Sequence, residues 1–220
     1  MTSALTSLRR WLGGHAKRAE AGPTGRWIVV DTETAGLDPK RDRLLAIGAV
    51  AVDDAGILLD DSFEVVLKSD AASEAANIVV HGIGVGAQAA GVPAPDALAA
   101  FRDWAASAPR VAFHADFDRV ALRSAGAASG IAPDDAPWLD LAPLAAALSP
   151  DAHRRGRRSL DDWLSAFGIE CAVRHNAASD ALATAELLLR LRAIAATQGT
   201  RGFDALVKAA RAHKWLGSAD

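Results

Sequence analysis

The sequence has 220 residues, with 24 Lys and Arg against 27 Asp and Glu, which gives a formal net charge of −3 at pH 7. Half of the residues are hydrophobic and 23% are charged, a composition that excludes an intrinsically disordered chain. The charge balance excludes a strong global basic field, so a polyanionic partner must be held by a local patch or by metal ions.

The cysteine content and the hydropathy of the sequence exclude further classes of protein. Cys171 is the only cysteine, which excludes an internal disulfide framework, a zinc ribbon and an iron–sulfur site. No apolar run approaches the roughly 20 residues that span a bilayer. We therefore expect a soluble, cytoplasmic protein with no membrane partner, built as one large domain with extensions or at most two small domains.

The first 25 residues predict a helical extension followed by a linker. Apolar residues recur there at helical spacing, at Leu5, Leu8, Trp11 and Leu12. The stretch 21–25 has the composition of a linker. The helix is expected to pack on the domain or, alternatively, to present its basic residues to nucleic acid or to a partner.

Three strands are predicted next, over 27–30, 44–52 and 63–67, because these runs are apolar and lie between turn signals. The short connections predict an antiparallel meander. Helical periodicity and one further apolar run then predict helices at 94–108, about 117–125, 159–167, 179–196 and 203–215, and a fourth strand at 110–113. This order is typical of an α/β domain with a mixed sheet flanked by helices.

The expected division is an N-terminal extension over 1–25, a main domain over 26–197 and a C-terminal helix over 198–220. That last helix has an apolar face, which predicts packing on the same domain. Docking of a polymerase or formation of a homodimer is the alternative use of this face.

Two carboxylates stand at the end of the first predicted strand. Asp31 and Glu33 flank Thr32, and alternate residues of a strand point to the same side. Carboxylate oxygens are the ligands that hard divalent cations prefer, so this pair suggests a metal site. An acidic pair at a solvent-exposed strand end is the alternative.

A second acidic pair, Asp116 and Asp118, follows the fourth predicted strand where a helix begins. Either residue could cap that helix. Asp118 could instead project from the first helical turn into a cleft at the carboxyl end of the strand.

The third group is His175 and Asp180, which precede and open a late apolar helix. Five residues along one helix turn the side chains about 140° apart, so His175 must come from the preceding loop. There it could serve as a base, because an unperturbed histidine has a pKa near 6.5. A capping aspartate beside a surface histidine is the alternative.

These groups together resemble the DEDDh group of the DnaQ-like 3′-to-5′ exonuclease superfamily, which includes proofreading exonucleases of bacterial DNA polymerases. The matching motifs are WIVVDTETAGLD, VAFHADFD and RHNAASDALATAELLL, with IVVHGIG and RRSLDDWLSAFGIE between them. Their order, over roughly 27–191, makes a chance match improbable.

The resemblance implies a ribonuclease-H-like fold with a mixed five-stranded sheet, and a nuclease that uses two divalent ions, Mg²⁺ or Mn²⁺. It implies that Asp31, Glu33 and Asp180 hold one ion, that Asp31 and Asp118 serve the second, and that His175 is the general base. The implied product is a nucleoside 5′-monophosphate.

Several positions depart from the family pattern: Phe113 and His114 replace a usual His-Asn pair, and Ala35 and Gly84 each replace a usual Thr. None of these changes removes an implied metal ligand or the base. They bear on contacts with the terminal nucleotide.

Weaker substrate contacts are predicted at eight positions, Thr32, Thr34, Gly36, Leu37, His81, His114, Phe117 and Arg158. Leu37 would be an apolar wedge against the last bases, or a plain turn residue. Arg158 closes a basic run over 153–158 that is either a phosphate track or a solvated charge run.

The expected substrate is a nucleic acid with a free 3′ end, single-stranded DNA in preference to RNA. An oligoribonuclease-like or RNA-trimming enzyme is the closest alternative, because the metal ligands do not distinguish the two sugars. A catalytically silent nucleic-acid-binding or polymerase-docking module is the alternative from another class.

Overall fold

The computed structural model describes residues 25–69, 78, 81–132, 135–151 and 158–217. The predicted N-terminal helix, most of the linker and residues 153–157 of the basic run lie outside these ranges. No helix in the described ranges is long and apolar enough to cross a bilayer.

The described part of the chain contains a mixed five-stranded sheet with the strand order β3-β2-β1-β4-β5. Its strands are β1 (Trp27–Thr34), β2 (Leu44–Val52), β3 (Ile57–Val66), β4 (Arg110–Ala112) and β5 (Trp138–Asp140). The first three form the predicted antiparallel meander, and β4 and β5 add in parallel beside β1. The predicted mixed five-stranded α/β sheet is therefore confirmed.

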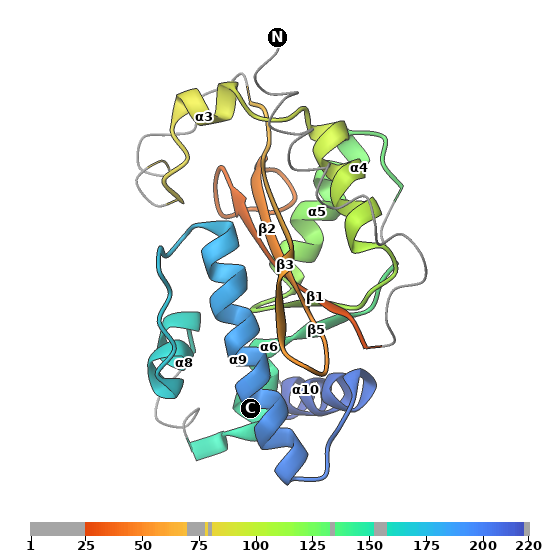
Figure 1. Ribbon diagram of the computed structural model, residues 1–220, viewed down its shortest axis with the longest axis vertical. Coiled ribbons are helices and arrows are strands. Elements are labelled where there is room, and N and C mark those ends of the chain that lie inside the picture. The colour runs from red at the N-terminus through yellow and green to blue at the C-terminus, as the bar shows by residue number, and fades with distance from the viewer. Residues whose placement is uncertain (1–24, 70–77, 79–80, 133–134, 152–157, 218–220) are drawn as a thin grey trace.

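Alternation along β1 divides the hydrophobic core into two layers. Trp27 and Val29 point to the layer that contains α6 (Leu141–Leu148), α8 (Leu160–Phe167) and α9 (Ala177–Thr197). Ile28 and Val30 point to the opposite layer, with α4 (Ala94–Ala105) and the apolar side of α5 (Asp116–Ala128). Figure 1 shows α9 running along one side of the strands, with α4 and α5 grouped away from it.

The C-terminal helix α10 (Phe203–Gly217) packs beside α6 and β5. Leu206 and Ala210 are buried there with the core of the α9 layer. The ring of Phe203 meets that of Trp27 edge to face at 5.3 Å. This packing places α10 next to the edge of the sheet at which β5 lies.

The elements predicted within the described ranges exist, but several of their boundaries were wrong. The first and third strands are longer than predicted, because β1 extends beyond its apolar run to Thr34 and the exposed Asp60 lies inside β3. The helix predicted over 94–108 ends at Ala105, where the guanidinium of Arg110 donates to the carbonyl oxygens of Ala105, Ala106 and Ala108.

Three elements were not predicted from the sequence: the short helix α3 (Val85–Ala89), β5 and α6. Strand β5 has three residues, too few for a period to show, and α6 follows it directly. Helix α6 is buried over most of its length, so its sequence is apolar without an amphipathic repeat.

Candidate active site

The acidic residues of β1 are separated from Thr32 by the alternation of the strand. Asp31 and Glu33 lie on the same face of β1 as Trp27 and Val29, which pack in the α9 layer. Thr32 lies on the opposite face of the strand. The end of β1 therefore offers two carboxylates to α9 and one hydroxyl to α5.

A glycine allows α9 to approach this pair closely. Gly48 of β2 is paired directly with Asp31 of β1. A Cβ atom at Gly48 would lie 2.1 Å from the backbone carbonyl carbon of Ala177, in the first turn of α9. Because any side chain here would collide with backbone, Gly48 brings the N-terminus of α9, and with it Asp180, against the end of β1.

Helix α9 begins with a hydrogen-bonded cap. Asn176 is the N-cap residue, and its side-chain oxygen accepts from the backbone N–H of Ser179 at 3.0 Å. The alternative in which Asp180 is the cap was therefore wrong. Asp180 lies one turn into the helix and is 4% exposed. Because its carboxylate does not cap the helix, it is available to the site.

The carboxylate of Asp180 is held from the loop that precedes α9. The backbone N–H of His175 donates to it at 2.9 Å and the Cys171 thiol at 3.1 Å. The guanidinium of Arg174 forms an ion pair with Asp180 and a second one, at 2.5 Å, with Asp161 of α8. Arg174 thus connects two helices at the acidic site.

Three carboxylates meet at the end of β1. Oxygen atoms of Asp31, Glu33 and Asp180 all lie within 4.8 Å of one another. Asp31 and Glu33 are half-buried and Asp180 is buried, so water does not fully screen their repulsion. This donor set of hard oxygen ligands could hold a divalent cation.

Asp118 approaches the same place from the other layer of the sheet. It lies in the first turn of α5, is 4% exposed, and accepts a hydrogen bond of 2.8 Å from the Thr32 hydroxyl. The N-cap of α5 is Ala115, without a side-chain hydrogen bond. The capping alternatives for Asp116 and Asp118 were therefore wrong, and Asp118 is a buried acid beside Asp31.

Burial raises the pKa values of Asp31, Glu33 and Asp118, and repulsion from neighbouring carboxylates adds to this effect. The pKa of Asp31 lies well above its usual value because of burial and then the charges of Asp118, Glu33 and Asp180. Burial, followed by the charges of Asp180 and Asp118, raises the pKa of Glu33 to about 8. Burial also raises the pKa of Asp118 to about 7, against the lowering effect of the Thr32 hydrogen bond. A cluster that resists ionisation by itself is suited to a bound cation.

His175 stands at the rim of this cluster. It is exposed, has a left-handed backbone conformation with φ of 60°, and immediately precedes the cap of α9. Its position in the loop before α9 agrees with the argument from helical spacing. The exposed imidazole can therefore meet a ligand that enters the acidic site from solvent.

Three of the predicted substrate residues lie where β1 ends, Thr34 as its last residue and Gly36 and Leu37 in the loop that follows. The Thr34 hydroxyl donates to the carbonyl oxygen of Gly36 at 2.6 Å, and the carboxylate of Asp42 accepts from the backbone N–H of Asp38 at 2.7 Å. These bonds order the loop, while Leu37 at its tip is 93% exposed.

His114 lies in the turn between β4 and α5, and Phe117 lies in the first turn of α5. His114 has a positive φ of 60°, and its backbone N–H donates to the Asp140 carboxylate at 3.0 Å. Its ring contacts that of Phe113, with centroids 4.6 Å apart. Phe117 is half-buried, one residue before Asp118.

His81 and Arg158 each take part in a hydrogen bond with a residue close to them in sequence. His81 is 5% exposed, and its Nδ1 accepts from the backbone N–H of Ile83 at 3.0 Å. Burial lowers the pKa of His81, which favours the neutral ring as a turn acceptor. The backbone N–H of Arg158 donates to Asp162 in the first turn of α8.

Sequence reasoning missed three residues that shape the site, namely Gly48, Cys171 and Arg174. Gly48 lies within an apolar strand and Arg174 directly before His175, so neither stands out by type. The position of Arg174 beside two predicted site residues was the one available signal.

Comparisons with known proteins agree with this geometry. The model of a family described as exonuclease, of the RNase T type, matches residues 28–188. A DNA polymerase III subunit epsilon-like protein of Rhodobacter capsulatus is 31% identical over 206 residues, which cover 91% of this chain and 29% of that protein. A PolC-type DNA polymerase III of Caldanaerobacter subterraneus is 27% identical over 79% of this chain and 12% of that protein. The chain thus spans less than a third of the length of either relative.

Two solved structures share the fold. Escherichia coli exonuclease I, in complex with a dT13 oligonucleotide, superposes with a TM-score of 0.68 at 17% identity, over 80% of this chain and 42% of that chain. Exonuclease X, in complex with 5′ overhanging duplex DNA, gives a TM-score of 0.64 at 21% identity, over 84% of this chain and 99% of that chain.

Proposed function

Because the chain belongs to the exonuclease family of the RNase T type, we propose that it is a metal-dependent 3′-to-5′ exonuclease that releases nucleoside 5′-monophosphates from single-stranded DNA. The single observation that carries the proposal is the meeting of Asp31, Glu33 and Asp180 within 4.8 Å, with Asp118 buried beside them. The four acids come from one strand and from helices in both layers of the sheet. An acidic patch on the surface would not need side chains from such distant elements to meet.

In this proposal the acids hold two divalent ions, Mg²⁺ or Mn²⁺. Asp31, Glu33 and Asp180 would bind the first ion, and Asp31 and Asp118 would bind the second ion. When bound, such ions stabilise the charge on the attacking and leaving oxygens of a phosphodiester. Arg174 and the backbone N–H of His175 keep the Asp180 carboxylate in its orientation.

His175 acts as the general base in this mechanism. Its backbone N–H binds Asp180, and its exposed ring can take a proton from the attacking water, after which solvent carries the proton away. The side chain need not move into the protein interior, because the loop before α9 already holds it at the rim of the cluster.

DNA is the proposed polymer. Both solved neighbours were observed with DNA, and the two sequence relatives are named for DNA polymerase III. The exposed Leu37 lies at the tip of a hydrogen-bonded loop next to the acids of β1, which suits contact with the terminal bases. The remaining contacts are assigned to Thr32, Thr34, Gly36, His81, His114, Phe117 and Arg158.

The direct test is cleavage of 5′-labelled single-stranded DNA and matched RNA with Mg²⁺, with Mn²⁺ and with a chelator. We expect a ladder that shortens from the 3′ end only when metal is present, and faster on DNA. Asp31→Asn should reduce the rate at least about a thousandfold, because a ligand that supports several kcal/mol of transition-state stabilisation is lost.

Asp96→Asn is the matched control, since Asp96 is an exposed carboxylate in the first turn of α4. Its rate should equal that of the wild type. A ladder with the chelator, or an active Asp31→Asn protein, would contradict the metal mechanism. A faster ladder on RNA would assign the chain to RNA trimming instead, and binding of both polymers without cleavage would indicate a silent binding module.

A further inference from the structure

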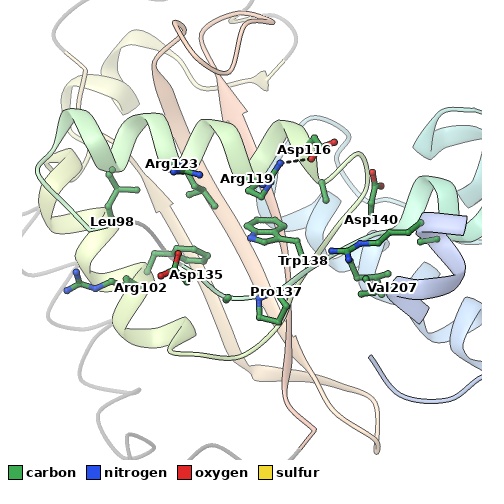
Figure 2. A pocket seen from close by; sticks show the side chains of 18 of the residues that line it. Leu98, Arg102, Asp116, Arg119, Arg123, Asp135, Pro137, Trp138, Asp140 and Val207 are labelled. Carbon is green, nitrogen blue, oxygen red and sulfur yellow. Dashed lines mark hydrogen bonds and ion pairs between the residues drawn. The ribbon is translucent and has the colours of Figure 1, made fainter. Parts of the chain in front are cut away.

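A second concave site lies on the outer side of α5, away from the carboxylates of β1. It is a cavity of about 490 Å³ bounded by α4, α5, β5 with the loop before it, and α10 (Figure 2). This volume lies in the range of cavities that hold small organic ligands. The proposed nuclease mechanism uses none of its side chains.

The cavity is rich in cations. Its basic lining residues are Arg102, Arg119, Arg123, Arg211 and Lys214. Two of the three acids in the lining are already engaged: Asp116 accepts from Arg119 and Lys214, and Asp140 accepts from two backbone N–H groups. Five basic side chains against three acids leave a net positive charge in the lining, although Arg102 also pairs with Asp103 of α4, and this net charge favours an anion.

Two neighbouring arginines are suited to one phosphate group. Arg119 and Arg123 are four residues apart on α5, so their Cβ atoms lie about 6 Å from each other on one face. Within the described ranges Arg123 has no hydrogen-bonding or ionic partner, and Arg119 uses only Nη2 towards Asp116. The remaining guanidinium N–H groups can donate to phosphate oxygens.

An aromatic surface lies between these arginines and the opposite wall. Trp138 of β5 is half-exposed, and Figure 2 shows its indole ring in the middle of the cavity with Arg119 and Arg123 on the helix above it. Leu98 and Val207 supply apolar surface from α4 and α10. A flat apolar group can stack on the indole while its phosphate reaches the arginines.

We propose that this cavity is a second nucleotide site, which binds a nucleoside monophosphate with its base on Trp138 and its phosphate between Arg119 and Arg123. A nucleobase and a phosphate are the two parts that an indole face and paired guanidinium groups recognise together. The site does not depend on the proposed nuclease activity, because metal ions and the acids of β1 take no part in it.

Isothermal titration of the whole chain with 2′-deoxyadenosine 5′-monophosphate in the presence of a chelator tests the proposal. We expect a dissociation constant below about 1 mM. Adenosine and inorganic phosphate, titrated separately, should each bind at least about tenfold more weakly, since each lacks one recognised part. Arg123→Ala should weaken the nucleotide at least about tenfold through lost charge-assisted hydrogen bonds.

Two variants separate this site from the acidic one. Arg190→Ala removes an exposed arginine of α9 outside the cavity and should bind like the wild type. Asp31→Asn should also keep its affinity. Absence of binding by the wild type, equal binding by Arg123→Ala, or loss of binding in Asp31→Asn would each overturn the proposal. Failure of the nuclease assay would leave this titration unaffected.

Discussion

The first turn of α5 separates two sites of opposite charge. Asp118 faces inward, is 4% exposed, and burial raises its pKa to about 7. Asp116, two residues earlier, faces outward, and its pKa is lowered, mainly by the hydrogen bond from Lys214 and against the opposing effect of burial. Identical carboxyl groups thus have pKa shifts of opposite direction within one helical turn.

The contrast shows that surroundings, rather than residue type, decide what a carboxylate can do. On the inner side, repulsion between poorly screened carboxylates favours the binding of a cation. On the outer side, Arg119 and Lys214 pair with Asp116, and the excess of basic residues around the cavity favours the binding of an anion. The same helix therefore contributes an acid to the proposed metal site on one side and basic residues to the proposed anion site on the other.

The largest expected effect comes from Asp118→Asn, which removes the inner charge and keeps an oxygen that can accept from Thr32. The nuclease rate should fall about a thousandfold, from lost support of metal-bound charge. The melting temperature of the metal-free protein should stay the same or rise, because one repulsive buried charge is gone. Rate assays with thermal melts check both, and an unchanged rate would remove Asp118 from the site.

His175→Gln should lower the rate about a hundredfold, which is the typical contribution of a positioned general base. Because no metal is assigned to His175, we expect Mn²⁺ to raise the melting temperature of the variant and of the wild type by the same amount. A rate within a factor of about two of the wild type would rule out His175 as the base.

Arg174→Ala should lower the rate about tenfold, as expected when a group that orients a metal ligand is lost. Arg174→Lys should not restore the rate, because an ammonium group does not reproduce the two-sided contact with Asp161 and Asp180. Mn²⁺ titrations followed by melting temperature should show weaker metal binding in both variants. Full activity of the lysine variant would contradict this positioning role.

The inner acids also predict how stability depends on pH without metal. A carboxyl group whose pKa is raised by folding binds its proton more tightly in the folded state, so its contribution to stability is present at low pH and is lost as pH rises through the folded pKa. For Glu33 and Asp118 that loss spans the range from about pH 4 to about pH 8.

With a chelator, the melting temperature should therefore fall by about 5 °C between about pH 5 and pH 8. Mn²⁺ should reduce this slope, because a cation favours the ionised acids. Differential scanning calorimetry at several pH values measures it. A melting temperature that rises over this range in chelator would contradict the assigned repulsion.

The smallest effect belongs to the outer side. Asp116→Asn breaks exposed ion pairs with Arg119 and Lys214, which contribute little because water and salt screen them. The melting temperature should fall by at most about 2 °C at low salt and not measurably at high salt. A larger, salt-independent loss would show that the outer pairs hold α5 in place.

Much of the fold was predictable because the signals are local. Apolar runs with turn sequences gave the meander, and periodicity gave α4, α5, α8, α9 and α10. Strand β5 and helix α6 were missed, since one is three residues long and the other is buried without an amphipathic repeat. The ordering of the carboxylates along the chain, together with the motif resemblance, identified the candidate acids.

The remainder of the site was not predictable because its contacts join distant parts of the chain. Thr32 and Asp118 are 86 residues apart in sequence, and Gly48 meets Ala177 only because a strand and a helix pack together. Arg174 became a site residue through its contacts with Asp161 and Asp180. The basic cavity likewise forms only when residues of α4, α5, β5 and α10 come together.

The sequence by itself determined which residue types stand at the ends of the elements and which side of β1 each faces, because alternation in a strand is a local property. Only the tertiary structure decided that four acids meet in a partly buried place, where burial and neighbouring charges raise the pKa values of Asp31 and Glu33, and that Asp116 stays outside with cations. Burial and the distance between charges depend on packing, and packing is not a property of any single segment.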